Sequence, residues 1–200
     1  MAKEISAQEV KVLREKSGAG IMACKNALVE CEGDVEAAME LLRKQGQEIA
    51  GKRAGRATAN GCVYSYIHAG DQIGVMVEVN CETDFVGRSE GFRKFCKETA
   101  MQIAAMRPKW VSREEVPEEA IAKERAILTE QALNEGKPAN IVDKMVEGRI
   151  KKFYETYCLL EQPFIRDDST CVQNLLTELI AKTGENCLVS RFCRYQVGED

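Results

Sequence analysis

The stretch from Ile73 to Asn80 alternates strictly between apolar residues and others, and no other pattern limits the fold of this chain as much. In an extended strand, such alternation places every second side chain on one face. The apolar face holds Ile73, Val75, Val77 and Val79. The segment 62–68, rich in Tyr and β-branched residues, predicts a second strand, with a hairpin turn at 69–71. With a third strand from about 188 to 197, the sequence predicts a small antiparallel sheet packed on one face.

The residues that end this strand place an aromatic ring beside a carboxylate. They run Asn80-Cys-Glu-Thr-Asp-Phe-Val86 and precede a segment with helical spacing, so we expect Asp84 and Phe85 in a connecting turn. Phe usually lies in the core, so a Phe at a turn either folds back onto the protein or is exposed for a partner. Spacing alone favours folding back.

The first fifty residues predict a bundle of three short helices. Ser6 and Glu9 form an S-x-x-E capping box at the start of the first helix, which ends at Gly18. A second helix follows, Asp34 is the expected N-cap of a third, and the helical module is expected to run from Ser6 to about Gly46. The glycine-rich, basic stretch 51–61 then predicts a linker. Its positive charges could contact RNA or an acidic partner, but a solvated hinge fits the composition better.

The rest of the chain is mainly helical. A helix is expected from the turn to about Met106, and Pro108 ends it. Two helices at about 117–157 form an antiparallel hairpin, and a last helix ends at Gly184. The acidic pair Asp167-Asp168 is expected in a loop. These elements define an α+β fold, in which a three-helix bundle precedes a small three-stranded sheet that is covered by helices and carries a protruding helical hairpin.

Nine cysteines are many for 200 residues, but their spacing does not suit a metal site. The odd number prevents all of them from pairing within one chain, and there is no Cys-x-x-Cys. Zinc sites need four Cys or His ligands in close pairs, and the only histidine is His68. We expect buried, structural thiols, rather than a metal site, a redox site or a structural disulfide.

No set of catalytic residues can be assembled from the sequence. There is no glycine-rich phosphate loop ending in Lys-Ser/Thr, and His68 lies at a strand end near a turn. We therefore expect no enzyme activity, no catalytic residues, no metal, no cofactor and no direct binding of nucleotide. The net charge of −4 gives no broad field for nucleic acid or membrane. The N-terminal sequence has no signal peptide pattern, so a cytoplasmic location is expected.

Three motifs, in this order, resemble the elongation factor Ts family: Gly18–Lys25, Thr83–Val86 and Met145–Arg149. That family is the guanine nucleotide exchange factor of the translational GTPase EF-Tu. The resemblance runs from about Ala2 to about Gly198. It implies a ubiquitin-associated-type (UBA-like) three-helix domain at 1–50, a linker at 51–61, and a core domain at 62–200 that carries the helical hairpin.

The resemblance also implies which residues bind EF-Tu. One set inserts into the GTPase domain: Thr83, Asp84, Phe85 and Val86. Phe85 would push between elements of that domain and disturb the Mg²⁺ and phosphate environment, while Asp84 holds the register beside it.

A second implied contact belongs to the three-helix domain and consists of Lys25 with its neighbours Ile21 and Met22. Without the family, Lys25 is better explained as a solvated charge on a helix, and Ile21 and Met22 as core residues of the bundle.

Longer members of the family carry two related sheet subdomains, whereas this chain has residues for one. It resembles the short form, in which two chains are expected to pair as a homodimer. Two other functions stay open beside the exchange factor. One is a non-catalytic scaffold that binds proteins through the three-helix domain. The other is an enzyme with a reactive cysteine such as Cys81, although the sequence offers no base beside it.

Overall fold

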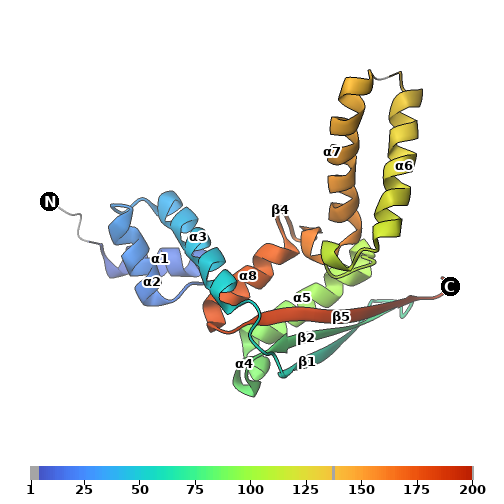
Figure 1. Ribbon diagram of the computed structural model, residues 1–200. Helices are drawn as coiled ribbons and strands as arrows, with labels where there is room; N and C mark the ends of the chain where they lie inside the picture. Colours follow the sequence, from blue (N-terminus) through green and yellow to red (C-terminus); the bar gives the residue numbers. More distant parts are fainter. Residues whose placement is uncertain (1–4, 137, 200) are drawn as a thin grey trace. The chain divides into compact units, whose positions relative to one another are not determined.

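The computed structural model describes residues 5–136 and 138–199, and it confirms the expected α+β fold (Figure 1). The helices are α1 (Ala7–Ser17), α2 (Ile21–Glu30), α3 (Val35–Arg53), α4 (Asp84–Arg88), α5 (Glu90–Met106), α6 (Glu118–Asn134), α7 (Ala139–Tyr157) and α8 (Val172–Thr183). The strands are β1 (Asn60–Ile67), β2 (Ile73–Cys81), β3 (Pro163–Phe164), β4 (Asp167–Cys171) and β5 (Cys187–Gln196). Two 3₁₀ turns are η1 (Arg113–Glu115) and η2 (Leu159–Glu161).

The chain forms two compact units. Unit 1 contains the described residues of Met1–Cys62, with Val79–Phe95 and Asn174–Leu188. Unit 2 contains Val63–Glu78, Cys96–Gln173 and the described residues of Val189–Asp200. Both units therefore take segments from distant parts of the sequence. The expected division into domains at residues 50 and 61 stays a prediction.

Helices α1 and α3 of unit 1 begin where the caps predict, and α1 ends at Gly18 as expected. The Ser6 hydroxyl accepts the Glu9 N–H at 3.2 Å, and the Glu9 carboxylate accepts the Ser6 N–H at 2.8 Å, which completes the capping box. The Asp34 carboxylate accepts two N–H groups of the first turn of α3. The three helices enclose a small core of buried side chains: Val10, Leu13, Cys24, Ala27, Leu28 and Ala38.

Helix α3 is longer than expected, because it continues through Gly46 to Arg53. Gly46 is buried, and a Cβ atom added there would lie 3.4 Å from the Cβ of Ala181 on α8. The glycine thus allows a close approach of two helices within unit 1. It also follows that the linker expected at 51–61 is irregular only over 54–59, since 51–53 belong to α3 and 60–61 to β1.

The three-stranded sheet has the order β1-β2-β5 and is antiparallel. The predicted alternation holds in β2, where Val75, Val77 and Val79 are buried and Met76 is exposed. The turn between β1 and β2 lies at Gly70 and Asp71, which have φ angles of 92° and 58°.

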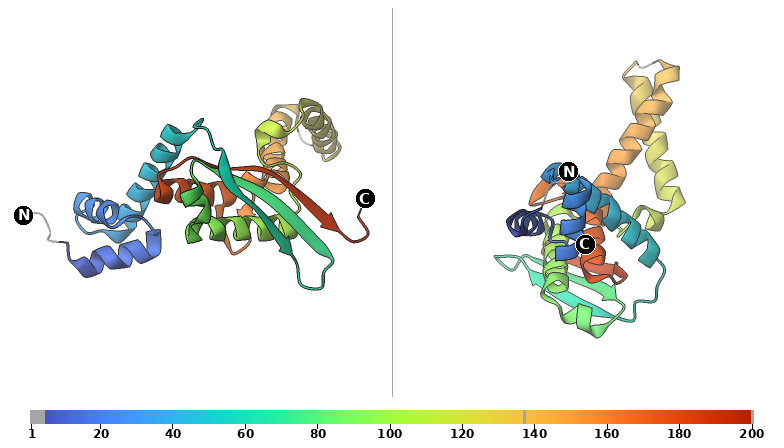
Figure 2. Two further views of the ribbon diagram at one scale, coloured as in Figure 1. Left: turned by 90° about the horizontal axis from the view of Figure 1, so that it is seen from below. Right: turned by 90° about the vertical axis from the view of Figure 1, so that its left-hand side faces the viewer.

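The helical hairpin of unit 2 is formed by α6 and α7, which lie side by side in both views of Figure 2. Its interior contains Leu128, Ala132, Val142, Val146 and Ile150. Ion pairs join the two arms: Arg125 with Glu147, and Arg149 with Glu135 at 2.8 Å. These contacts explain how an arm with few apolar residues pairs with its neighbour.

A second, two-stranded sheet of β3 and β4 was not expected from the sequence. The pair Asp167-Asp168 begins β4, so its assignment to a loop was wrong. Buried Gln102 of α5 supports this hairpin, because its side chain donates to the Pro163 carbonyl at 3.0 Å and accepts the Ile165 N–H at 2.9 Å. Because this support comes from α5, the sequence of the two short strands alone gives little indication that they form a sheet.

Candidate partner-binding site

Asp84 and Phe85 lie in a short helix, and not in a connecting turn as expected. Thr83 is the N-cap of α4, and its hydroxyl accepts the Val86 N–H at 3.4 Å. The Gly87 N–H donates to the Thr83 carbonyl at 3.2 Å, which closes the helical turn. Asp84 and Phe85 are therefore the first and second residues of a capped helix, where the backbone direction is set by hydrogen bonds.

Phe85 projects into solvent, with 81% of its surface exposed. Its neighbours in the motif have contacts within the protein: Val86 is buried, and Asp84 forms an ion pair with Arg88 at 3.1 Å. The alternative that Phe85 folds back onto the protein is therefore wrong. Exposure of such a large apolar ring leaves most of its area available for burial in a complex.

A close contact of backbones lies beneath α4, and sequence reasoning missed it. Gly61 of β1 has φ 148°, and a Cβ atom there would lie 2.1 Å from the Val79 carbonyl oxygen. A Cβ atom on Gly87 of α4 would meet the Gly61 carbonyl oxygen at 3.5 Å and the Cys81 sulfur at 3.4 Å. Gly61 was assigned to the linker, where glycine is unremarkable, so the sequence held no signal of this contact.

Two glutamates join the start of α4 to the segment before β5, all within unit 1. The Glu185 carboxylate accepts the Thr83 N–H at 3.0 Å and the Thr83 hydroxyl at 2.7 Å. In return, the Glu82 carboxylate accepts the Asn186 N–H at 2.7 Å. That N–H, and then Arg56, lower the pKa of Glu82 below its usual value. Neither glutamate was singled out from the sequence.

The second predicted set lies on one exposed face of α2. Ile21 is 55% exposed and Met22 is 64% exposed, so the alternative that they form the bundle core is wrong. Lys25 is exposed one turn further on, and Val29, 51% exposed and missed in the sequence, extends the face by another turn. Among the described residues, no hydrogen bond or ion pair joins this face to Thr83–Val86.

All nine cysteines are free thiols, and five of them are buried. Burial, and then the charge of Glu185, raise the pKa of Cys81, whose thiol donates to the Thr83 carbonyl at 3.1 Å. Burial likewise raises the pKa of Cys187 to about 12. A cysteine nucleophile needs a lowered pKa, so these environments argue against an enzyme built on Cys81.

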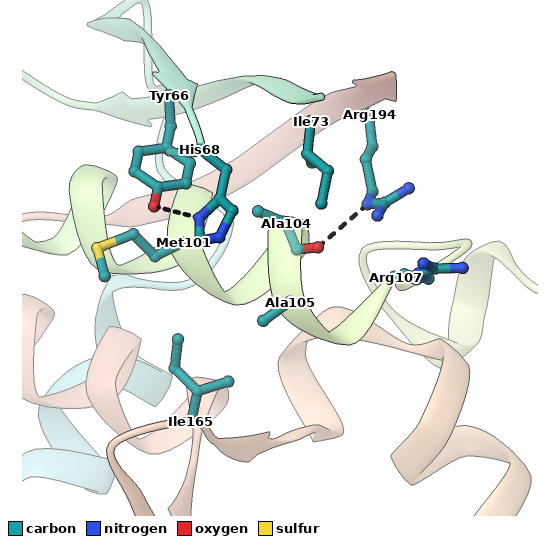
Figure 3. Close-up of a pocket in the computed structure, with 9 residues that line it drawn as sticks. All are labelled: Tyr66, His68, Ile73, Met101, Ala104, Ala105, Arg107, Ile165 and Arg194. Carbon is teal, nitrogen blue, oxygen red and sulfur yellow. Dashed lines mark hydrogen bonds between the residues drawn. The ribbon is translucent and has the colours of Figure 1, made fainter. Parts of the chain in front are cut away.

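His68 lies beside a pocket of unit 2, shown in Figure 3. Its ring Nδ1 is 2.9 Å from the Tyr66 hydroxyl, and the two rings stack at a tilt. On the other side, Arg194 donates to the Ala104 carbonyl at 3.2 Å and pairs with Glu199 at 2.8 Å. Because these polar groups are held by neighbours within the chain, they are best explained as structural contacts.

The described residues hold no cluster of three His, Cys, Asp or Glu side chains suited to a metal ion. Within the same residues, no helix is long and apolar enough to cross a membrane. What unit 1 presents instead is an exposed aromatic ring on a capped helix and an exposed apolar helical face with a lysine. Such features are typical of a protein that acts by binding another protein.

Comparison with known proteins agrees with this class. Residues 3–199 match the sequence profile of the family described as "Elongation factor TS". Elongation factor Ts of Caldanaerobacter subterraneus subsp. tengcongensis is 58% identical over 195 residues, which cover 98% of each chain. That of Moorella thermoacetica is 57% identical, covering 98% of this chain and 96% of its own. That of Desulforamulus reducens is 59% identical over 196 residues, covering 98% of this chain and 90% of its own.

The chain belongs to the elongation factor Ts family. This membership confirms the resemblance drawn from the three motifs. It makes the chain a translation elongation factor of the exchange-factor type.

Proposed function

We propose that this protein promotes the release of GDP from EF-Tu by inserting Phe85 on α4 into the GTPase domain. The observation that carries the proposal is the exposed ring of Phe85 on a helix whose first turn is capped by Thr83. Membership of the elongation factor Ts family supports EF-Tu as the partner. A cytoplasmic location goes with this role and stays a prediction.

Exchange of this kind needs no catalytic residue in the exchange factor itself. Each 1.36 kcal/mol by which a partner lowers the barrier to nucleotide release speeds that release about tenfold. The coupling is reciprocal. The exchange factor lowers the affinity of the GTPase for nucleotide, and bound nucleotide lowers the affinity of the GTPase for the exchange factor by the same factor. A rigid insert and a surface that fits the nucleotide-free state are sufficient.

Two further contacts complete the proposed site. Asp84, next to Phe85, sets the register of the inserted helix, and its ion pair with Arg88 is exposed on both sides and can exchange partners. The face of α2 with Ile21, Met22 and Lys25 binds the same GTPase domain. Its exposed apolar side chains and single positive charge suit a partner surface with a carboxylate beside an apolar groove.

The first test is direct. Stopped-flow measurement with fluorescent GDP is expected to show faster release from EF-Tu when the protein is added. Calorimetry is expected to show no binding of GDP to the protein alone. The scaffold alternative predicts binding to a partner without any change in the release rate. An unchanged release rate from the cognate EF-Tu, or stoichiometric GDP binding to the isolated chain, would contradict the proposal.

The protein also forms a homodimer through the part of the three-stranded sheet that lies in unit 2. One face of this sheet exposes large apolar side chains: Val63, Ile67, Met76, Tyr195 and Val197. Ile67 lies over Gly74 of the neighbouring strand. An exposed apolar face of this kind is typical of a protein–protein interface, and a two-fold dimer of identical chains is the commonest assembly that covers such a face.

The variant Met76→Lys is expected to dissociate this dimer, because each chain would bury an unpaired ammonium group in the interface. Sedimentation under reducing conditions measures the effect and excludes covalent pairs formed by the cysteines. Ile127→Lys is the matched control, since Ile127 is 41% exposed on the hairpin and lies away from the sheet face. A wild-type protein that stays monomeric at tens of micromolar and exchanges nucleotide at one to one would refute the dimer.

A further inference from the structure

We propose that Glu185 is a positioning residue for Phe85. Its carboxylate holds Thr83, and through Thr83 it holds the first turn of α4 in the geometry that enters the partner. The inference rests on the proposed function and adds a residue that lies 102 positions beyond Thr83 in the sequence.

The hydrogen bonds of Thr83 explain how a distant carboxylate can orient α4. Both donors of Thr83 end on Glu185, the N–H at 3.0 Å and the hydroxyl at 2.7 Å. A threonine hydroxyl has one hydrogen, so once it points to Glu185 its lone pairs are left to accept the Val86 N–H at 3.4 Å. Glu185 therefore selects the hydroxyl orientation that caps the helix.

Glu185 is itself held in place by its surroundings. It follows the end of α8, and its N–H donates to the Thr183 hydroxyl at 3.3 Å. The N–H of its neighbour Asn186 donates to Glu82, next to Thr83, and the Asn186 side chain donates to the Arg56 carbonyl at 2.8 Å, between α3 and β1. Each of two segments thus supplies a carboxylate to the backbone of the other. Hydrogen bonds to a charged acceptor are shorter and stronger than neutral ones.

Helix α4 depends on such support because it is only five residues long. A helix of this length does not hold its shape on its own. The ring of Phe85 is exposed and has little packing to fix it, so the direction of the ring follows the backbone of the first turn. The buried Val86 and Gly87 keep α4 attached to the unit when Glu185 is removed. What is lost is the order of the first turn before binding, which weakens binding to the exchange-active state.

The test is a double-mutant cycle that measures GDP release from EF-Tu. Glu185→Ala is expected to slow release by about threefold to tenfold in the otherwise wild-type protein, a range that matches the net contribution of a typical hydrogen bond. In a Phe85→Ala background it is expected to change nothing, because the ring it positions is absent. Glu178→Ala is the matched control, since it removes the same charge from α8 and loses only an exposed pair with Lys182. Equal slowing in both backgrounds, or none in the wild-type background, would overturn the proposal.

A second measurement separates this proposal from the proposed function. In Glu185→Ala, hydrogen exchange of the Thr83 and Val86 amides is expected to speed up, with the melting temperature nearly unchanged. Glu185→Gln is expected to restore part of the protection, because its single carbonyl oxygen can still accept from the Thr83 hydroxyl. Should Phe85→Ala leave GDP release unaltered, the proposed function fails, and faster amide exchange still supports the anchoring by Glu185. Unchanged amide exchange refutes the anchoring in every case.

Discussion

Replacement of Phe85 by alanine is expected to slow GDP release from EF-Tu by about ten- to a hundredfold. The ring is 81% exposed in the free protein, so its burial occurs in the complex, where it is worth roughly 1.5–3 kcal/mol. If that burial is realised mainly in the exchange-active state, nearly all of it appears in the rate. The free energy of unfolding should hardly change, because no core contact is lost. Stopped-flow release and thermal unfolding measure the two effects.

A buried phenylalanine in the next helix provides the contrast. Phe92 of α5 has no exposed surface, and its replacement by alanine is expected to cost about 3–5 kcal/mol of stability. The two variants remove the same side chain from positions only seven residues apart. A fall in melting temperature for Phe85→Ala as large as that for Phe92→Ala would show that Phe85 belongs to the core, and the insertion hypothesis would be lost.

The variant Gly61→Ala is expected to destabilise the protein strongly. Its φ of 148° is unfavourable for alanine, and the added Cβ would lie 2.1 Å from the Val79 carbonyl oxygen and 2.7 Å from the Asn80 Cα. Both obstacles are backbone atoms, so no side-chain rotation can relieve the clash. We expect a loss of about 3 kcal/mol or more, which lowers the melting temperature of a chain of this size by roughly 6–12 °C.

Gly70→Ala isolates the part of this cost that comes from the clash. Gly70 also has a positive φ, of 92°, but an added Cβ would meet no atom within 4 Å. Its replacement should cost only the backbone strain, about 1–2 kcal/mol. Equal melting temperatures for the two variants would show that β1 can shift away from β2 at little cost. Because Gly61 also supports Gly87 of α4, we expect Gly61→Ala to slow nucleotide exchange as well.

Local patterns in the sequence were sufficient to predict features that depend on a single helix or strand. The capping box of Ser6 and Glu9 formed as predicted, and so did the N-cap at Asp34. The alternation in β2 placed Val75, Val77 and Val79 inside the protein. Each of these features depends on residues within four positions of one another, where helix and strand geometry determines which side chains meet.

The same patterns failed where distant segments decide the outcome. Gly46 suggested the end of the third helix, yet α3 continues through it to Arg53, and Gly46 lies against Ala181 on α8. Gly61 suggested a flexible linker, yet it lies in β1 against the backbone of Val79. Thr83–Phe85 suggested a connecting turn, yet these residues begin helix α4, with Thr83 as the N-cap and Glu185 bonded to it.

The sequence by itself determined the family, the α+β class, and the motif with an aromatic ring beside a carboxylate. Short motifs and periodicities can be recognised from the order of the residues alone, without the fold. It left open whether Phe85, Ile21 and Met22 were core or surface. Tertiary structure alone decided that they are exposed, because exposure depends on which other elements cover a face. It alone also brought Glu185 to Thr83, since a hydrogen bond between residues 102 positions apart leaves no trace in local spacing.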